Sequence, residues 1–152
     1  MKEIIIAINR KAKFNYNLLQ GYTAGVQLKG HEVKSIKQNQ VSLKESYCVI
    51  NNNEIWIKNM HISEYKHNSE KEYNPIRTRK LLLNKLEIEK INKKSTIKGH
   101  SIIPVKIIIN QKGLIKIKIS LAKGKNIHDK RKSIKEKDIK KNTDIDLKKR
   151  AL

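Results

Sequence analysis

The sequence of 152 residues lacks features that several protein classes require. Its only cysteine is Cys48, which excludes a scaffold held by disulfides. No apolar run approaches the roughly 20 residues that a membrane-spanning helix needs. The apolar run Ile4–Ile8 is shorter than the hydrophobic region of a signal peptide and lacks a cleavage-site pattern, so it predicts a strand. These absences and the length predict a cytoplasmic protein with one folded domain.

Acidic residues are scarce, because 14 Asp and Glu stand against 35 Lys and Arg, for a net charge of +21. Lys and Arg set against phosphates release condensed counterions, so this charge predicts a polyanionic partner. A lipidation motif and a basic amphipathic helix with aromatic residues are both missing, which favours nucleic acid over a membrane. Only five basic residues are Arg, and the wealth of Lys, Ile and Asn is typical of A+T-rich coding, so some lysines reflect base composition.

Aromatic residues make up only 5 % of the chain, too few for a platform on which successive bases stack. Recognition through phosphates and shape is expected instead, which fits structured RNA. A general binder of structured RNA or of single strands is the alternative, and it would be indifferent to which RNA it is offered.

Residues that could perform catalysis are few. His61, Glu64 and His67 lie close together in a polar stretch but lack the spacing of metal ligands. Cys48 lies in a strand-like run, which predicts a small core residue rather than a nucleophile. We therefore predict a protein that is not an enzyme and holds no metal or cofactor. An RNA-processing hydrolase that uses His61, Glu64 and His67 with a metal is the alternative, and it requires metal-dependent turnover.

Alternation of apolar and polar residues dominates the first two thirds of the chain. Strands are predicted at residues 4–8, 16–28, 41–50, 54–57, 101–109 and 114–121. The strand at 16–28 is expected to bulge or bend at Gly21 and Gly25. Turn residues at 51–53 and 110–113 predict two hairpins.

Two helices and a loop complete the predicted fold. The helices are expected at residues 30–36 and 76–91, the second opened by Pro75, and the polar loop at 61–74. The fold class is therefore mainly β with flanking helices, as a small antiparallel β-barrel of the oligonucleotide-binding type. A sandwich of two sheets is the alternative.

Basic residues cluster at several places on this fold. Arg10, Lys11 and Lys13 follow one another closely after Asn9. Lys116 and Lys118 alternate with isoleucines and so share the outer face of their strand. The basic run at residues 77–80 stands at the predicted start of a helix, where backbone N–H groups favour phosphate. These clusters together favour RNA binding.

The composition changes after residue 122, which divides the chain into a barrel domain (1–122) and a basic C-terminal tail (123–152). The tail holds 12 Lys and Arg, 5 Asp and Glu, and no aromatic residue. Ser133 and Glu136 have the spacing of a capping box, which predicts a helix start. The isoleucines form no continuous stripe, and an isolated helix without an apolar face is marginal in water. We predict a tail that is disordered when free and helical when bound.

Several short motifs follow one another between about residue 8 and residue 138. They are Asn9-Arg10-Lys11-Ala12-Lys13, Gly30-His31-Glu32-Val33-Lys34-Ser35, Asn59-Met60-His61-Ile62-Ser63, Arg77-Thr78-Arg79-Lys80-Leu81-Leu82-Leu83, Ala122-Lys123-Gly124-Lys125 and His128-Asp129-Lys130-Arg131. In this order and at this spacing they resemble the small protein B family, the SsrA-binding proteins of bacteria.

The resemblance implies a non-catalytic role in trans-translation. Members of the family bind the tRNA-like domain of transfer-messenger RNA and deliver it to stalled ribosomes, so that the nascent peptide is tagged for degradation. The implied partners are this RNA, the ribosome at its decoding centre and mRNA channel, and elongation factor Tu through the RNA complex. No membrane is involved, and a monomer is expected. The implied fold is an antiparallel barrel of the oligonucleotide-binding type with a tail that becomes helical in the mRNA channel.

The residues expected to act come from this resemblance and from the basic clusters. The RNA-binding set is Asn9, Arg10, Lys11, Lys13, Thr23, Ala24, Gly25, Leu82, Lys116, Lys118, Lys123 and Lys125. The set expected at the ribosomal decoding centre and channel is His128, Asp129, Lys130, Arg131, Ile134, Lys135, Glu136 and Ile139. Two positions depart from the family: Thr23 replaces a usual Glu, and Ile139 replaces a usual large aromatic residue.

Overall fold

The computed structural model describes residues 2–151. Met1, the first residue of the predicted barrel domain, and Leu152, the last residue of the predicted tail, lie outside the described residues. The strands are β1 (Ile4–Ile8), β2 (Tyr16–Val26), β3 (Val41–Ser42), β4 (Tyr47–Asn51), β5 (Glu54–Lys58), β6 (His61–Ile62), β7 (Arg79–Leu82), β8 (His100–Ile109) and β9 (Ile115–Gly124). The helices are α1 (Arg10–Asn15), α2 (Gly30–Lys37), α3 (Lys85–Ser95) and α4 (Ile127–Arg150).

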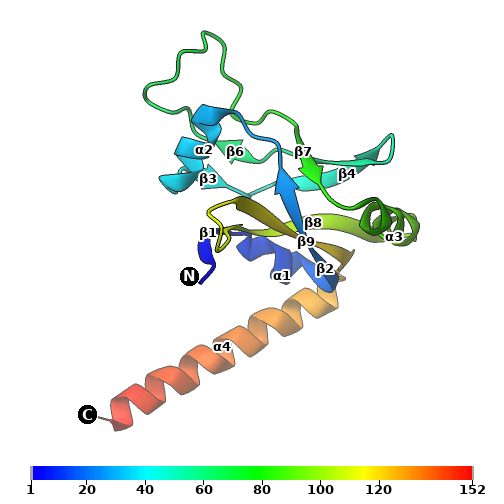
Figure 1. The fold of residues 1–152 in the computed structure, drawn as a ribbon. Helices are drawn as coiled ribbons and strands as arrows, with labels where there is room; N and C mark the ends of the chain where they lie inside the picture. The colour runs from blue at the N-terminus through cyan, green and yellow to red at the C-terminus, as the bar shows by residue number, and fades with distance from the viewer. Residues whose placement is uncertain (1, 152) are drawn as a thin grey trace.

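Seven strands form one antiparallel sheet in the order β1-β8-β4-β5-β7-β2-β9. An additional pairing between β8 and β9 closes this sheet into a ring, with β1 attached alongside β8 (Figure 1). Fully buried residues of the core, among them Ile55, Ile57, Ile107 and Ile117, line the inside of the ring. The prediction of a mainly β, antiparallel barrel with flanking helices is confirmed, and the two-sheet sandwich is wrong.

Both predicted hairpins are present. Asn52 and Asn53 connect β4 to β5 with φ values of 51° and 59°, a left-handed conformation that asparagine tolerates well. Gly113, with a φ of 79°, lies in the turn between β8 and β9.

Cys48 is buried in β4, and burial raises the pKa of its thiol far above the ordinary value. Its predicted role as a small core residue is therefore confirmed.

The helix predicted at 76–91 is wrong in its first half, where residues 79–82 form β7, and is confirmed from Lys85 onward, where α3 begins. Residues of β7 alternate instead, since Leu81 is buried in the core and Leu82 is 47 % exposed. α3 begins only after Asn84, which forms a capping box with Glu87. The basic run at 77–80 therefore does not open a helix, and the phosphate site predicted there is wrong as well.

Three smaller predictions also differ from the structure. The run at 41–50 is divided into β3 and β4, because the chain turns where Ser46 N–H donates to the Leu43 carbonyl oxygen. The loop predicted at 61–74 begins with β6, which pairs with β3. The irregular register of β2 lies between Leu18 and Gln20 rather than at a glycine.

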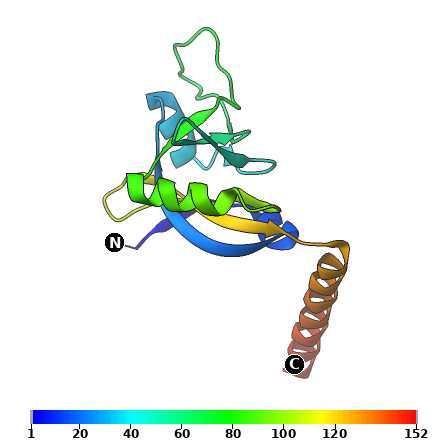
Figure 2. The same cartoon turned by 90° about the vertical axis from the view of Figure 1, so that its right-hand side faces the viewer.

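Helix α4 extends away from the barrel in both views (Figures 1 and 2). It begins after Asn126, whose side-chain oxygen accepts a hydrogen bond of 2.8 Å from Asp129 N–H. The start predicted at Ser133 is wrong, because the Ser133 hydroxyl instead donates to the Asp129 carbonyl oxygen inside the helix. Side chains of α4 are exposed or half-buried wherever they are described. Disorder of the free tail stays a prediction.

Candidate nucleic-acid interface

Three neighbouring strands, β7, β2 and β9, bring together residues that are far apart in the sequence. Gly25 of β2 is paired with Leu82 of β7 on one side and with Lys116 of β9 on the other. Thr23, two residues earlier, is paired with Lys118. Ala24 lies between them with its side chain fully buried in the core. This outer face therefore carries five of the predicted RNA-binding residues, Thr23, Gly25, Leu82, Lys116 and Lys118.

Gly25 lets its two strand neighbours close over the backbone at the centre of this face. A Cβ atom at this position would lie 3.2 Å from Leu82 Cβ and 3.5 Å from Lys116 Nζ. Gly25 itself is buried, so the Leu82 and Lys116 side chains, and not the Gly25 backbone, are what this face presents to a partner.

Lys106 of β8 adds a third lysine, which the sequence analysis did not identify. It is paired with Lys118, and two positions further along the strands Ile108 is paired with Lys116. The sequence feature that could have identified Lys106 is that it is the only charged residue in the apolar strand 101–109. The Lys118 ammonium is 3.1 Å from a Glu3 carboxylate oxygen. We call this face the strand surface and define it by Thr23, Gly25, Leu82, Lys106, Lys116 and Lys118.

A second group of the predicted residues lies around α1. Asn9 is buried, and its Nδ2 donates a 2.9 Å hydrogen bond to the Pro104 carbonyl oxygen. Its amide therefore holds the start of α1 against β8. Arg10 and Lys13 are exposed, whereas the Lys11 ammonium is 2.8 Å from a Glu45 carboxylate oxygen.

The end of β9 joins this group. Lys125 N–H donates to the Asn15 carbonyl oxygen at 2.9 Å, and Lys125 Nζ donates to the Lys13 carbonyl oxygen at 2.9 Å. Lys123 lies beside Asn17 in the β2–β9 pairing. We define the α1 surface by its basic residues Arg10, Lys11, Lys13, Lys123 and Lys125. The predicted RNA-binding set thus falls into two separate groups.

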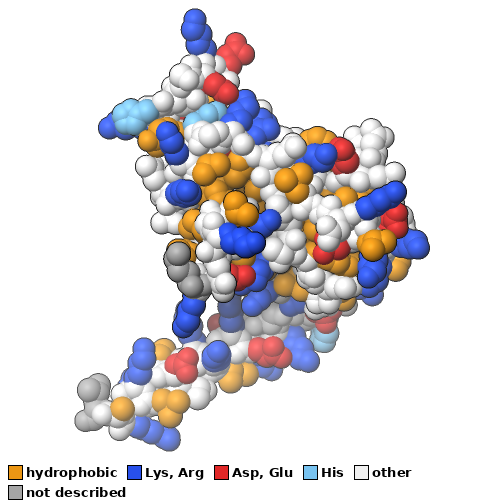
Figure 3. Space-filling model, in the orientation of Figure 1, with side chains coloured by type: hydrophobic (Ala, Val, Ile, Leu, Met, Phe, Trp, Pro, Cys, Tyr) orange, Lys and Arg blue, Asp and Glu red, His pale blue; other side chains and the backbone are white. Residues whose placement is uncertain are grey.

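The predicted ribosomal set lies entirely on α4. The first turns carry His128, Asp129, Lys130 and Arg131, and the following turns carry Ile134, Lys135, Glu136 and Ile139. Ile134 and Ile139 are 47 % and 57 % exposed. Lys and Arg side chains are spread over the visible face of the barrel and along α4 (Figure 3).

A buried ion-pair network, which sequence reasoning missed, connects elements that adjoin the strand surface. The Glu32 carboxylate on α2 is fully buried and accepts hydrogen bonds from Arg77 Nη2 at 2.5 Å and from Arg79 Nε. Arg79 Nη1 also donates to the Met60 and Arg77 carbonyl oxygens at 2.7 and 3.0 Å, and Nη2 to that of Pro75 at 3.2 Å. The network ties α2, which follows β2, to the start of β7.

The charge state of Glu32 follows from its partners. Burial alone raises the pKa of this carboxyl group, but hydrogen bonds from Arg77, Arg79 and Lys29 N–H and the charge of Arg79 outweigh burial and lower the pKa below its ordinary value of 4.5. A lowered pKa in the folded state stabilises the fold above the unfolded value, and this stabilisation is lost as the pH falls through the folded pKa.

We therefore expect acid to weaken the contribution of Glu32. The difference in free energy of unfolding between the wild type and Glu32→Gln should be largest near neutral pH and should shrink as the pH falls below 4.5. Urea titrations of both proteins between pH 3 and pH 7 measure this difference. A difference that stays constant across the range would contradict the prediction.

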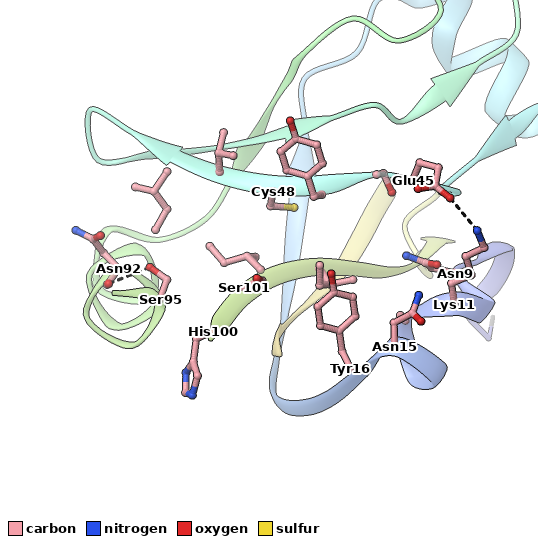
Figure 4. Close-up of a pocket in the computed structure, with 17 residues that line it drawn as sticks. Asn9, Lys11, Asn15, Tyr16, Glu45, Cys48, Asn92, Ser95, His100 and Ser101 are labelled. Atoms are coloured by element: carbon pink, nitrogen blue, oxygen red, sulfur yellow. Dashed lines mark hydrogen bonds and ion pairs between the residues drawn. The ribbon is translucent and has the colours of Figure 1, made fainter. Parts of the chain in front are cut away.

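A groove lies between β4 and β8, where the two strands, within the described residues, pair only at Cys48 and Ile102 (Figure 4). Its volume is about 820 Å³. Polar side chains from four elements or their ends line it, among them Asn9, Asn15, Asn92 and Ser95, and the Lys11–Glu45 ion pair closes one end.

Within residues 2–151 no group of three or more His, Cys, Asp and Glu side chains converges on a point that could hold a metal ion, and His61, Glu64 and His67 do not form one. None of the helices described in this range is long and apolar enough to cross a membrane.

Comparison with known proteins identifies relatives over most of the chain. The family model described as SmpB protein matches residues 6–149. An SsrA-binding protein of Christiangramia forsetii is 46 % identical over 144 residues, which are 95 % of this chain and 92 % of the relative. An SsrA-binding protein of Ehrlichia canis is 48 % identical over 134 residues, 88 % of this chain and 90 % of the relative.

A solved structure agrees with these relatives. A chain in the structure described as "tmRNA-SmpB: a journey to the center of the bacterial ribosome" has a TM-score of 0.66 and 37 % identity, covering 79 % of this chain and 84 % of that one. Sequence, fold and the order of the motifs therefore agree, and the chain belongs to the SmpB family of SsrA-binding proteins.

Proposed function

We propose that this protein binds transfer-messenger RNA through its barrel and delivers it to stalled ribosomes in trans-translation. Membership of the SmpB family supports this role, as does the solved relative, a tmRNA-SmpB structure in the ribosome. The single structural observation that carries the proposal is the pairing of Gly25 with both Leu82 and Lys116. It creates one basic face from three strands, suited to a folded RNA rather than to stacked bases.

The two basic surfaces and α4 have separate tasks in this proposal. The strand surface and the α1 surface contact the tRNA-like domain of the RNA. Helix α4 enters the mRNA channel, with His128 to Arg131 nearest to the decoding centre. The protein acts in the cytoplasm as a monomer, performs no covalent chemistry, and meets elongation factor Tu only through the RNA complex.

Thr23 leaves the strand surface without the carboxylate that is usual at this position. Lys118, its partner across the strands, instead pairs with Glu3. We propose that Glu3 supplies the negative charge that keeps Lys118 oriented. The pair is partly exposed, so its contribution to stability is small, about 0–1 kcal/mol.

A competition titration tests the proposed function. Labelled transfer-messenger RNA is titrated with the full chain at several salt concentrations, with bulk tRNA as competitor. Selective binding that survives the competitor, with a salt slope corresponding to a few phosphate contacts, is expected. Equal competition with a steep slope would indicate a general binder of structured RNA. Metal-dependent cleavage of the RNA would instead favour the hydrolase alternative.

Lys116→Glu should weaken binding of transfer-messenger RNA by about tenfold, because it removes one phosphate contact and adds a like charge to the RNA. The Lys116 side chain lies on the outer face, so the melting temperature should change little. Lys71→Glu is the matched control, with the same change of charge on the exposed loop between β6 and β7. Equal loss of affinity in both variants, or a sharp drop in melting temperature for Lys116→Glu, would contradict the assignment.

A further inference from the structure

Strand β1 has an open edge. Within the described residues it pairs only with β8, so alternate backbone N–H and C=O groups point away from the sheet. Ile4 and Ile8 are 57 % and 56 % exposed. Edge strands are normally protected by charged side chains, by proline or by a covering element. The run Ile-Ile-Ile-Ala-Ile carries neither charge nor proline.

A second open edge faces the same space. Strand β3 pairs only with β6 in the described part of the chain. A groove of about 360 Å³ lies between the end of β1 and β3, which occupy the same side of the molecule (Figure 1). Ala7, Val41 and Leu43 line it and also contact the hydrophobic core. The groove therefore has an apolar floor and a strand at each side.

We propose that this groove binds an extended, acidic peptide segment of a partner protein as an added strand. Strand addition uses main-chain hydrogen bonds for affinity and alternate side chains for specificity. Both are available here, because the open edges supply the N–H and C=O groups and the apolar floor accepts every second side chain. This groove adjoins the α1 surface, with which it shares Arg10 and Lys11, and the binding of a peptide there goes beyond the proposed function.

The charges around the groove identify an acidic occupant. Arg10 and Lys44 line it, both are exposed, and neither forms an ion pair with another described residue. The nearby Lys11 is already paired with Glu45. Carboxylates of a peptide would complement the two free cations. A second copy of this chain fits less well, since two bodies of charge +21 repel each other.

RNA is also a weaker candidate for this groove than for the basic surfaces. Phosphate oxygens only accept hydrogen bonds, whereas a strand edge presents donors and acceptors alternately. A peptide backbone satisfies both kinds of group, and RNA phosphates satisfy only the donors.

Amide NMR spectra of the full chain test the proposal. The probe is a seven-residue peptide that alternates Asp with Val, and a copy N-methylated at alternate residues lacks half of the donors. Binding of the first peptide, with shifts confined to amides of β1 and β3 and at least tenfold weaker binding of the methylated copy, is expected. No shifts at these amides with 1 mM peptide, or equal binding of both peptides, would overturn the proposal.

Variants separate this interface from nonspecific attraction. The double variant Ile8→Glu with Lys44→Glu should weaken peptide binding about tenfold or more, because it places like charges at the groove. Leu86→Glu with Lys71→Glu is the matched control, since Leu86 is also exposed and lies on α3. Equal weakening by both double variants would overturn the proposal. The proposal would also be overturned if the β1 amides shifted with a single-stranded RNA dodecamer but not with the peptide. Shifts of these amides on raising the protein concentration alone would overturn it as well, because they would indicate self-association.

Discussion

Replacing Arg79 with methionine is expected to lower the free energy of unfolding by about 3–5 kcal/mol. Methionine keeps much of the length of the side chain but removes every donor. The Glu32 carboxylate then remains buried with Arg77 and Lys29 N–H as its only hydrogen-bond donors, and the carbonyl oxygens of Met60 and Pro75 lose the bonds that Arg79 donates. A buried charge that loses its partner is among the most destabilising changes known for a single substitution.

Thermal unfolding followed by circular dichroism measures this effect. A loss of this size corresponds to a melting temperature lower by about 10 °C or more. Arg150→Met, at the exposed end of α4, removes the same charge and should change stability by less than about 0.5 kcal/mol. If Arg79→Met unfolds within 1 °C of the wild type, the network does not stabilise the fold as inferred.

A second variant distinguishes loss of the ion pair from loss of packing. The double variant Glu32→Met with Arg79→Met removes both buried charges and should regain part of the lost stability. Recovery is expected to be incomplete, because Lys29 N–H and the carbonyl oxygens that Arg79 served stay without their partners. A double variant that is less stable than Arg79→Met alone would contradict the role of the buried charge.

Deleting α4 should abolish peptide tagging while leaving the affinity for transfer-messenger RNA within about threefold of the wild type. The structure defines where to cut. β9 pairs with β2 as far as Gly124, and Lys125 is hydrogen-bonded to Asn15 and Lys13. A chain that ends at Asn126 keeps all of these contacts and loses α4, together with the hydrogen bond from Lys125 Nζ to the Ser133 hydroxyl.

RNA binding and tagging are expected to respond differently because the proposed RNA-binding surfaces lie on the barrel and the proposed ribosomal residues lie on α4. The strand surface and the α1 surface remain intact in the shortened chain, whereas His128 and the rest of the proposed ribosomal set are removed. Binding is measured by titration with labelled RNA, and tagging by incorporation of the tag in a reconstituted translation system with a message that lacks a stop codon. Equal loss of both activities would contradict this division of tasks, and so would tagging that survives the deletion.

The fold illustrates which features local sequence determines. Short apolar runs identified β1 and β8, and the alternation of apolar and polar residues identified the outward lysines of β9, because run length and side-chain period are local properties. The same local reasoning failed in the first half of the helix predicted at 76–91. Leu82, Leu83 and Leu86 have the spacing of a helical stripe, and only packing of β7 against β2 and β5 selects the strand.

The start of α4 shows a competition between two local signals. Ser133 and Glu136 have the form of a capping box, but Asn126 caps the helix two turns earlier. Asn126 and Ser133 are both residue types that suit a helix cap. The hydrogen bonds between Lys125 and α1 place the end of β9 beside Asn126. A tertiary contact therefore decided between two caps that the sequence allowed.

The sequence by itself determined the charge, the antiparallel strands, the two hairpins and the family, since composition, turn residues and motif order are read along the chain. Only the tertiary structure decided that Lys106 stands with Lys116 and Lys118, and that Arg79 is a buried partner of Glu32 instead of a phosphate ligand. The physical reason is that strand register and burial depend on packing between residues distant in sequence.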